Sequence, residues 1–184
     1  PVQVLISDII KISGGRYFSM ALKNDGTVWT FGQNGHGQLG NGTTTNSNTP
    51  VQVTGLTNVE HISGAAFHAM AILDDGSLYS WGRNDYGQLG DGTTTNSSLA
   101  IQIAGISNVI EIAGGTNYSL AKTGNQSVYA WGRNANGQLG DGTTTDIYIP
   151  TLVNGMCQYS NIFNTGNTRI SAGWSHSVYV CENG

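Results

Sequence analysis

Apolar residues occur along the chain in short stretches that are rich in β-branched and aromatic side chains. Stretches such as IIKIS, SMALK, TVWTF and PVQV are bounded by glycine, asparagine, aspartate or proline, which is typical of β-strands joined by turns. NDG at 24–26 and DDG at 74–76 predict tight hairpin turns, because these residues adopt positive φ at little cost. Apolar residues do not recur with helical spacing, so the sequence predicts an all-β protein.

The pattern repeats at a fixed interval. Gly32, Gly82 and Gly132 lie 50 residues apart. A second phrase, of the type ISGG followed by SMAL, has the same spacing, and its fourth copy follows the third after 58 residues, which predicts an insertion. The four copies begin at Ile12, Ile62, Ile112 and Ile170.

Four short strands in each repeat are typical of the blades of a β-propeller. We expect three blades, at 12–54, 62–104 and 112–154. Residues 1–11 are expected to form the last strand of a preceding blade and a link, residues 155–169 an insertion, and residues 170–184 an incomplete blade. The fold class is therefore an all-β propeller of four-stranded antiparallel blades, of which about three and a half are present.

The third strand of each repeat carries two aromatic residues at alternating positions. The pairs are Trp29 and Phe31, Tyr79 and Trp81, and Tyr129 and Trp131. Alternate residues of a strand face the same side, so each pair is expected to pack against one neighbouring blade. Burial of each ring contributes about 2 to 3 kcal/mol, which favours a role in the core over ligand stacking.

A sixteen-residue phrase, WGRNDYGQLGDGTTTN at 81–96, has near copies at 31–46 and 131–146. A phosphate-binding loop is expected once and before a helix, so we interpret the phrase as a blade corner. Its asparagines are expected to cap a turn, its leucines to fill the corner and its glutamines to bond the backbone. The expected turn glycines are Gly37, Gly40, Gly87, Gly90, Gly137 and Gly140.

Calcium binding by this phrase is a weaker alternative. Asp91 and Asp141 offer oxygen ligands, but the spacing differs from that of the known helix-flanked calcium loop, and Asn41 replaces the aspartate in the first copy. We expect no metal site and no cofactor.

The positions at which the copies differ are the best candidates for a binding surface, since the frame is common to all copies. They lie before GQLG and in the turn after the GG phrase, and several are aromatic, histidine or other residues common at interface hot spots. The partner-binding candidates are Tyr17, His36, Phe67, Asp85, Tyr86, Asn136 and Trp174. The equivalent residues Phe18, His68, Tyr118 and His176 are expected instead to pack at the base of the hairpin.

Composition limits the partners. Seven Lys and Arg against eleven Asp and Glu give a net charge of −4, and the basic residues do not cluster, which argues against nucleic acid. No apolar run is long enough for a membrane span. Cys157 and Cys181 could form a disulfide in a secreted protein or remain two separate buried thiols. Few lysines and many Asn, Thr, Ser and Gly favour an extracellular or cell-surface protein, with a cytoplasmic one as the alternative.

Catalysis has little support in the sequence. The four histidines are scattered through the repeat, and Ser175 beside His176 has no defined acid partner. We therefore predict that the protein is not an enzyme.

Taken together, ISGG at 12–15, DG followed by LYSWGRNDYGQLGDG at 75–92, and PVQV at 50–53 resemble the repeat of the regulator of chromosome condensation family. The resemblance covers essentially the whole chain and implies a seven-bladed propeller. Seven such repeats need about 350 residues, so we expect a segment of a longer protein, or a ring completed by a second copy. The chain begins on a last strand and stops in a hairpin turn, which agrees with that expectation.

The family includes exchange factors for a small nuclear GTPase, chromatin-binding proteins and a bacterial secreted inhibitor of β-lactamase. Because the chain is acidic and has no basic tail, the expected function is a non-catalytic scaffold for binding another protein, secreted or on a cell surface and of bacterial origin. The alternatives are an intracellular regulator of the exchange-factor type and a propeller that binds carbohydrate or another small ligand.

Overall fold

A computed structural model describes residues 5–153 and 169–180. Within them the chain forms three four-stranded sheets and one two-stranded sheet, and no helix. The first sheet has β1 (Ile9–Gly14), β2 (Phe18–Lys23), β3 (Val28–Gly32) and β4 (Ser47–Gln52). The second has β5 (Val59–Gly64), β6 (His68–Leu73), β7 (Leu78–Gly82) and β8 (Ser97–Gln102). The third has β9 (Val109–Gly114), β10 (Tyr118–Thr123), β11 (Val128–Gly132) and β12 (Ile147–Leu152), and the last has β13 (Arg169–Ala172) and β14 (Ser177–Val180).

Each sheet is an antiparallel meander in which consecutive strands are neighbours. The NDG and DDG turns close the hairpins between the second and third strands, with Gly26 at φ 77° and Gly76 at φ 78°. In the third sheet Gln126 adopts φ 67° at the matching place. The local chemistry of the turns therefore fixes the meander.

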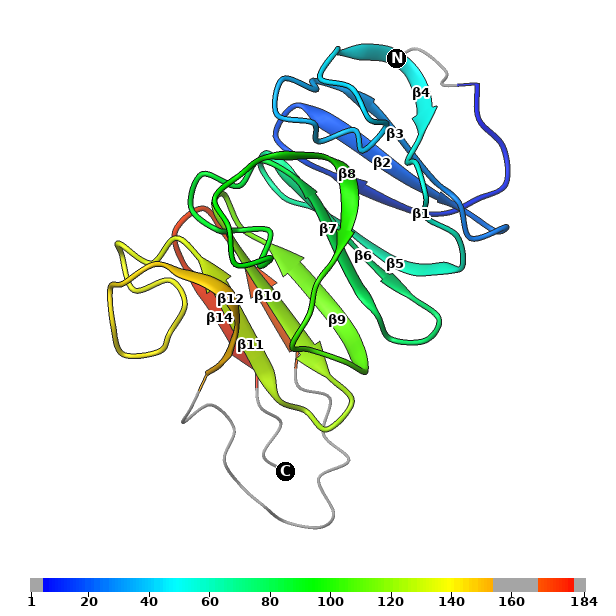
Figure 1. Cartoon of the computed structure of the whole chain (residues 1–184). Coiled ribbons are helices and arrows are strands. Elements are labelled where there is room, and N and C mark those ends of the chain that lie inside the picture. The colour runs from blue at the N-terminus through cyan, green and yellow to red at the C-terminus, as the bar shows by residue number, and fades with distance from the viewer. Residues whose placement is uncertain (1–4, 154–168, 181–184) are drawn as a thin grey trace.

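The sheets follow one another in chain order, as Figure 1 shows, with β1, β5, β9 and β13 at their inner edges. β5 contacts both β1 and β9, and β13 contacts β9, whereas β4, β8 and β12 are outer strands. This is the arrangement of propeller blades around an axis, and the chain forms a partial β-propeller.

Hydrophobic cores lie between successive blades. Trp81 of β7 packs with Leu22 and Val28 of the first blade, and Trp131 of β11 packs with Leu78 of the second. The alternation predicted for the third strand is therefore correct for the second and third blades, where the aromatic side of one blade meets the aliphatic side of the previous one. Trp29 and Phe31 of the first blade are only partly buried and belong to none of these cores. Trp81 and Trp131 are completely buried.

All four inner strands begin one to three residues before the expected blade boundaries. β1 begins at Ile9, β5 at Val59, β9 at Val109 and β13 at Arg169, so residues assigned to links and to the insertion are the first residues of inner strands. A β-bulge between Ile9 and Lys11 shifts the register of β1, and beyond it Ile9 still pairs with Lys23 of β2. The repeated phrase that starts at Ile12 does not reveal this extension of the strand. The rest of the expected insertion, the PVQV strand at 1–4 and both cysteines lie outside the described residues.

In the described part of the chain, no helix is long and apolar enough to cross a membrane.

Candidate protein-interaction face

The repeated GQLG phrase forms a corner that is built around a buried asparagine. In the second blade, Asn84 Oδ1 accepts a hydrogen bond from Leu89 N at 2.9 Å, and Asn84 Nδ2 donates to Thr93 O at 3.1 Å. Gln88 Oε1 accepts from Tyr86 N at 2.9 Å. The other two blades repeat these bonds, and the six predicted turn glycines have φ between +67° and +84°. The bonds hold the shape of the loop, and the asparagines have no exposed surface with which to bind a ligand.

The same corner joins each blade to the next. Trp81 Nε1 donates to Gln38 O at 3.0 Å, and Trp131 Nε1 donates to Gln88 O at 2.9 Å. In the third blade, Gln138 O accepts from Ser177 Oγ of β14 at 2.7 Å. The phrase therefore recurs once per blade because each interface between blades needs a carbonyl acceptor in this position.

The oxygen atoms that suggested calcium are used within the loop. Asp91 Oδ1 accepts from Asn84 Nδ2 at 3.0 Å, from Thr93 N at 3.0 Å and from Thr93 Oγ1 at 2.9 Å. Asp141 makes the same set of contacts with Asn134 and Thr143. Among the residues that the structure describes, no group of three or more His, Cys, Asp or Glu could hold a metal ion.

The residues expected at the base of the hairpin mostly pack there. Phe18, His68 and Tyr118 are buried, whereas His176 is exposed. Burial lowers the pKa of His68 to about 3, so its imidazole is neutral. His68 Nε2 lies 2.8 Å from Ser119 Oγ, which donates to Gln88 O at 2.8 Å.

Burial also raises the pKa of Tyr118 to about 12, and its hydroxyl accepts from Gly173 N at 3.1 Å.

Most of the predicted partner-binding residues come together on one end of the propeller, where the turns after the first strands and the loops before the fourth strands meet. Arg16 lies between aromatic rings from three blades. Its guanidinium carbon is 5.1 Å from the ring centroid of Tyr17, 5.7 Å from that of Phe67 and 5.2 Å from that of Trp174. These are cation–π distances. Tyr17 and Trp174 are 55% and 66% exposed, and Arg16 is exposed as well, so both the rings and the arginine are open to a partner.

The contacts continue across the second and third blades. The guanidinium carbon of Arg83 is 5.5 Å from the centroid of Phe67 and 5.9 Å from that of Tyr86, and that of Arg133 is 5.0 Å from Tyr86. The His36 ring meets Phe67 edge-on at 5.7 Å. We call this surface the arginine–aromatic strip; its residues are Arg16, Tyr17, His36, Phe67, Arg83, Tyr86, Arg133 and Trp174.

Two predicted residues lie beside the strip in other roles. Asp85 is exposed and accepts from Arg83 Nε at 2.7 Å, so it orients that arginine. Asn136 is exposed, and its main-chain N donates to Gln138 Oε1 at 2.9 Å. Its side chain is not part of the strip, and its binding role stays a prediction.

The three arginines of the strip were not among the predicted partner-binding candidates. Arg16 was left out, and Arg83 and Arg133 were treated as part of the repeated corner phrase. Their position is occupied by Gln33 in the first copy, so the copies differ here as well. That difference was the available signal. Only the packing of the blades shows that these two arginines alternate in space with Phe67 and Tyr86.

A cavity of about 380 Å³ opens beside the strip near the propeller axis. The turns after the first strands of four blades supply its wall, which is mostly glycine and alanine, with Arg16 and Trp174 at its edge. Arg16 N donates to Ala66 O at 3.2 Å, and Ala66 N donates to Gly115 O at 3.3 Å, so these turns are bonded to one another. The cavity therefore has a fixed wall of main chain and small side chains.

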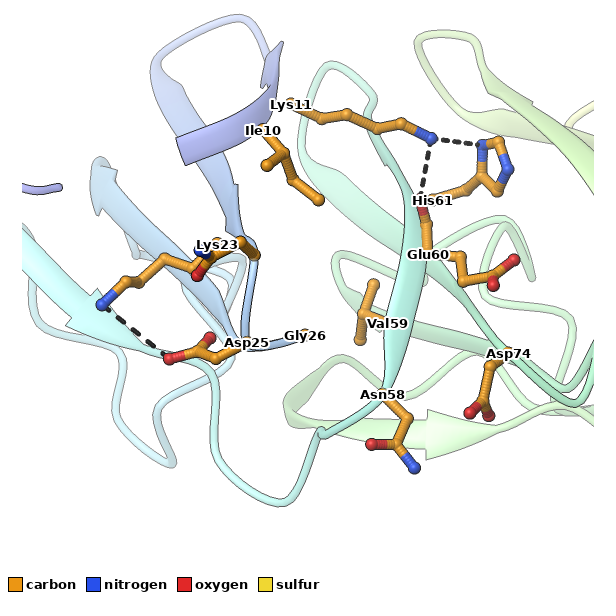
Figure 2. A pocket seen from close by; sticks show the side chains of 11 residues that line it. Ile10, Lys11, Lys23, Asp25, Gly26, Asn58, Val59, Glu60, His61 and Asp74 are labelled. Atoms are coloured by element: carbon orange, nitrogen blue, oxygen red, sulfur yellow. Dashed lines mark hydrogen bonds and ion pairs between the residues drawn. The ribbon is translucent and has the colours of Figure 1, made fainter. Parts of the chain in front are cut away.

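A second cavity of about 480 Å³ lies between the first two blades, at the end where the β2–β3 hairpin turns. Figure 2 shows Lys11 of β1 reaching Glu60 O at 2.8 Å and His61 Nδ1 at 3.1 Å on β5. Burial lowers the pKa of His61, and the Lys11 charge lowers it further. Lysine and carboxylate side chains are mixed around this cavity, so it has no clear charge preference and is the weaker candidate.

Comparisons with known proteins agree with the fold. A family model described as the regulator of chromosome condensation (RCC1) repeat matches residues 25–72, 75–121 and 125–180, and a second model of the repeat matches 9–38, 59–88 and 109–138. Among solved structures the chain is similar to Prp20p from Saccharomyces cerevisiae, a protein described with its binding to Gsp1p and histones. The identity is 21% and the TM-score 0.82, over 95% of this chain and 44% of that one.

Two other structures show the same likeness. Yeast RCC1 (Prp20) bound to Kap60 has 24% identity and a TM-score of 0.81, over 100% of this chain and 44% of that one. Human WBSCR16 has 19% identity and a TM-score of 0.55, over 99% of this chain and 60% of that one. This chain spans less than half the length of the Prp20 chains, and at these identities the likeness shows a shared fold. Because the RCC1 repeat model matches most of its length, the chain belongs to the regulator of chromosome condensation (RCC1) repeat family.

Proposed function

We propose that the chain is a non-catalytic module that binds another protein through the arginine–aromatic strip. The observation that carries this proposal is the alternation of Arg16, Phe67, Arg83, Tyr86 and Arg133 across three blades. Arginine and aromatic residues supply most hot spots in protein interfaces, and their rings bury a large area at a small entropic cost. A rigid propeller fixes their spacing, which lowers the entropy lost on binding.

The setting in which the chain works is part of this proposal. A secreted or cell-surface protein, of bacterial origin, fits the small number of lysines and the many Asn, Thr, Ser and Gly residues. The yeast relatives are described with protein partners, Gsp1p, histones and Kap60, which supports a protein partner here without indicating which one.

The proposal is tested by capture from intact cells, culture medium and cell extracts on the immobilised chain. The double substitution Tyr17→Ala and Phe67→Ala should abolish capture of the partner. Once the partner is purified, the affinity of the double variant for it should be about a hundredfold lower than that of the wild type. Ile10→Ala is the control, because Ile10 is 59% exposed at the opposite end of the propeller. Equal capture by the double variant would contradict the assignment of the face.

Two assays address the alternatives. Acceleration of nucleotide release from a small GTPase would contradict the non-catalytic role and favour an exchange factor. A glycan array signal that disappears with Trp174→Ala would favour carbohydrate binding instead of protein binding, since an exposed ring can stack on a sugar.

A further inference from the structure

We propose that the strip recognises an acidic residue of the protein partner, and that Arg16 binds its carboxylate. This inference rests on the proposed function and adds the chemistry of the partner. Arg16 holds the central place in the strip, because its guanidinium is in contact with Tyr17, Phe67 and Trp174 together.

The surroundings of Arg16 prepare it for such a ligand. Aromatic rings contact a guanidinium through its faces, which leaves the N–H donors at its edge for a carboxylate in bidentate geometry. The ring contacts restrict the long side chain before binding, so less conformational entropy is lost when the ion pair forms. Within residues 5–153 and 169–180, no ion pair joins Arg16 to a carboxylate.

The other two arginines of the strip differ from each other in whether they form an ion pair. Arg83 donates to Asp85 at 2.7 Å and is neutralised within its own loop. Arg133 contacts Tyr86 and, like Arg16, makes no ion pair in the described part of the chain. The corner loops of the second and third blades at this end also carry Asp91, Asp141 and Asp146. The corner loop of the first blade has Asn41 and Asn46 at the matching positions, so the first-blade loops at this end supply no carboxylate to Arg16. Charge complementarity at Arg16 itself therefore favours an acidic partner residue.

The cavity beside Arg16 gives the partner segment a place to enter. It has a volume of about 380 Å³, and its glycine and alanine wall allows a close approach to the main chain. Trp174 also lines the cavity. A side chain inserted there presents its carboxylate to Arg16 while its apolar part contacts the indole.

An acidic protein segment fits these observations better than a nucleic acid. Arginine alternating with aromatic residues also occurs on single-stranded nucleic-acid binding surfaces, but those surfaces follow the phosphate backbone with a dense row of positive charge. Here Arg16 and Arg133 are separate cations, and the same loops carry Asp85, Asp91, Asp141 and Asp146. We therefore treat an oligonucleotide as a competing outcome of the test.

The test uses an array of short peptides in matched pairs, in which the acidic member carries Asp or Glu and its twin carries Asn or Gln. Acidic members should bind the wild-type chain about tenfold more tightly than their twins, and added salt should weaken this preference. Arg16→Gln should reduce the preference to about twofold or less, and Arg16→Lys should retain part of it, because lysine keeps the charge but not the planar donor geometry. Nitrogen-15 NMR should show the Arg16 Nε–H and the Trp174 Nε1–H shifting together during titration with an acidic peptide.

Arg169→Gln is the matched control, since it removes one exposed positive charge at the far end of β13 and should leave the preference unchanged. Because Arg16 is exposed, its variants should keep the melting temperature of the wild type. Equal binding of both peptide types, or an undiminished preference in Arg16→Gln, would overturn the inference. If that binding still required Tyr17 and Phe67, the proposed function would stand. Absence of binding to every acidic peptide would also overturn the inference, as would tighter Arg16-dependent binding of a single-stranded oligonucleotide.

Discussion

The indole N–H of Trp81 in the second blade donates to the main-chain oxygen of Gln38 in the first blade, at 3.0 Å, and both side chains are completely buried. The next pair of blades repeats this bond between Trp131 and Gln88 O, which also accepts from Ser119 Oγ. In the second blade, Ala69 occupies the position of Ser119, so the described residues offer Gln38 O a single side-chain donor, Trp81.

Trp81→Phe should therefore cost more stability than Trp131→Phe. Both substitutions remove the same volume, but the first leaves a buried carbonyl without a side-chain donor. We expect losses in the free energy of unfolding of about 3 kcal/mol for Trp81→Phe and about 2 kcal/mol for Trp131→Phe. Urea titration of the two variants measures the difference, and an equal loss would show that the Ser119 bond to Gln88 O does not compensate for the lost indole donor.

Asn84→Ala should destabilise the corner of the second blade. The substitution removes the acceptor for Leu89 N and the donor to Thr93 O, both inside a buried loop. The expected loss is about 2 to 3 kcal/mol. Asn136→Ala is the control, because Asn136 is exposed and should change the free energy of unfolding by less than about 0.5 kcal/mol. Thermal and urea unfolding of both variants provide the comparison.

His68 should make the stability of the chain depend on pH. Its pKa falls from 6.5 to about 3 on folding, so below pH 6.5 the unfolded state binds a proton that the folded state does not. Above pH 6.5 His68 does not change the free energy of unfolding with pH. Between about pH 6 and pH 4 it lowers the free energy of unfolding by up to about 1.4 kcal/mol for each unit by which the pH falls. The test compares the free energy of unfolding with that of His68→Phe across this range.

Phe is the matched choice for this substitution, because Phe18 occupies the equivalent position in the first blade. The stability of the wild type relative to His68→Phe should fall as the pH is lowered, while titrating groups common to both proteins cancel. A difference that stays constant from pH 7 to pH 4 would contradict a buried neutral imidazole.

Two glycines at strand ends should respond differently to alanine. Gly82 has φ +105°, and a Cβ there would approach Phe67 O to 2.7 Å, so Gly82→Ala should cost about 2 kcal/mol or more. A Cβ at Gly14 meets no atom within 4 Å, so Gly14→Ala should stay within about 0.5 kcal/mol of the wild type. Differential scanning calorimetry of both variants checks the contrast, and similar melting temperatures would contradict it.

Much of the fold followed from local pattern. Short β-branched stretches between NDG and DDG turns predicted the strands and their antiparallel order, because side-chain alternation and turn geometry are local properties. The alternating pairs such as Tyr79 and Trp81 predicted which side of a blade is aromatic. The start of β1 at Ile9 was missed because a bulge changes the register there.

The candidate surface was only partly predictable. Variation among the copies identified Tyr17, Phe67, Tyr86 and Trp174, but residues such as Phe67 and Arg83 belong to different loops, and nothing in their spacing shows that they touch.

By itself the sequence determined the turns and the repeat of four short strands, because these depend on periodicity and on the backbone preferences of glycine, asparagine and aspartate. The tertiary structure decided that Arg16 lies among Tyr17, Phe67 and Trp174, three rings from three blades. Such contacts arise from the stacking of blades around an axis, which brings together residues that lie about 50 to 160 positions apart.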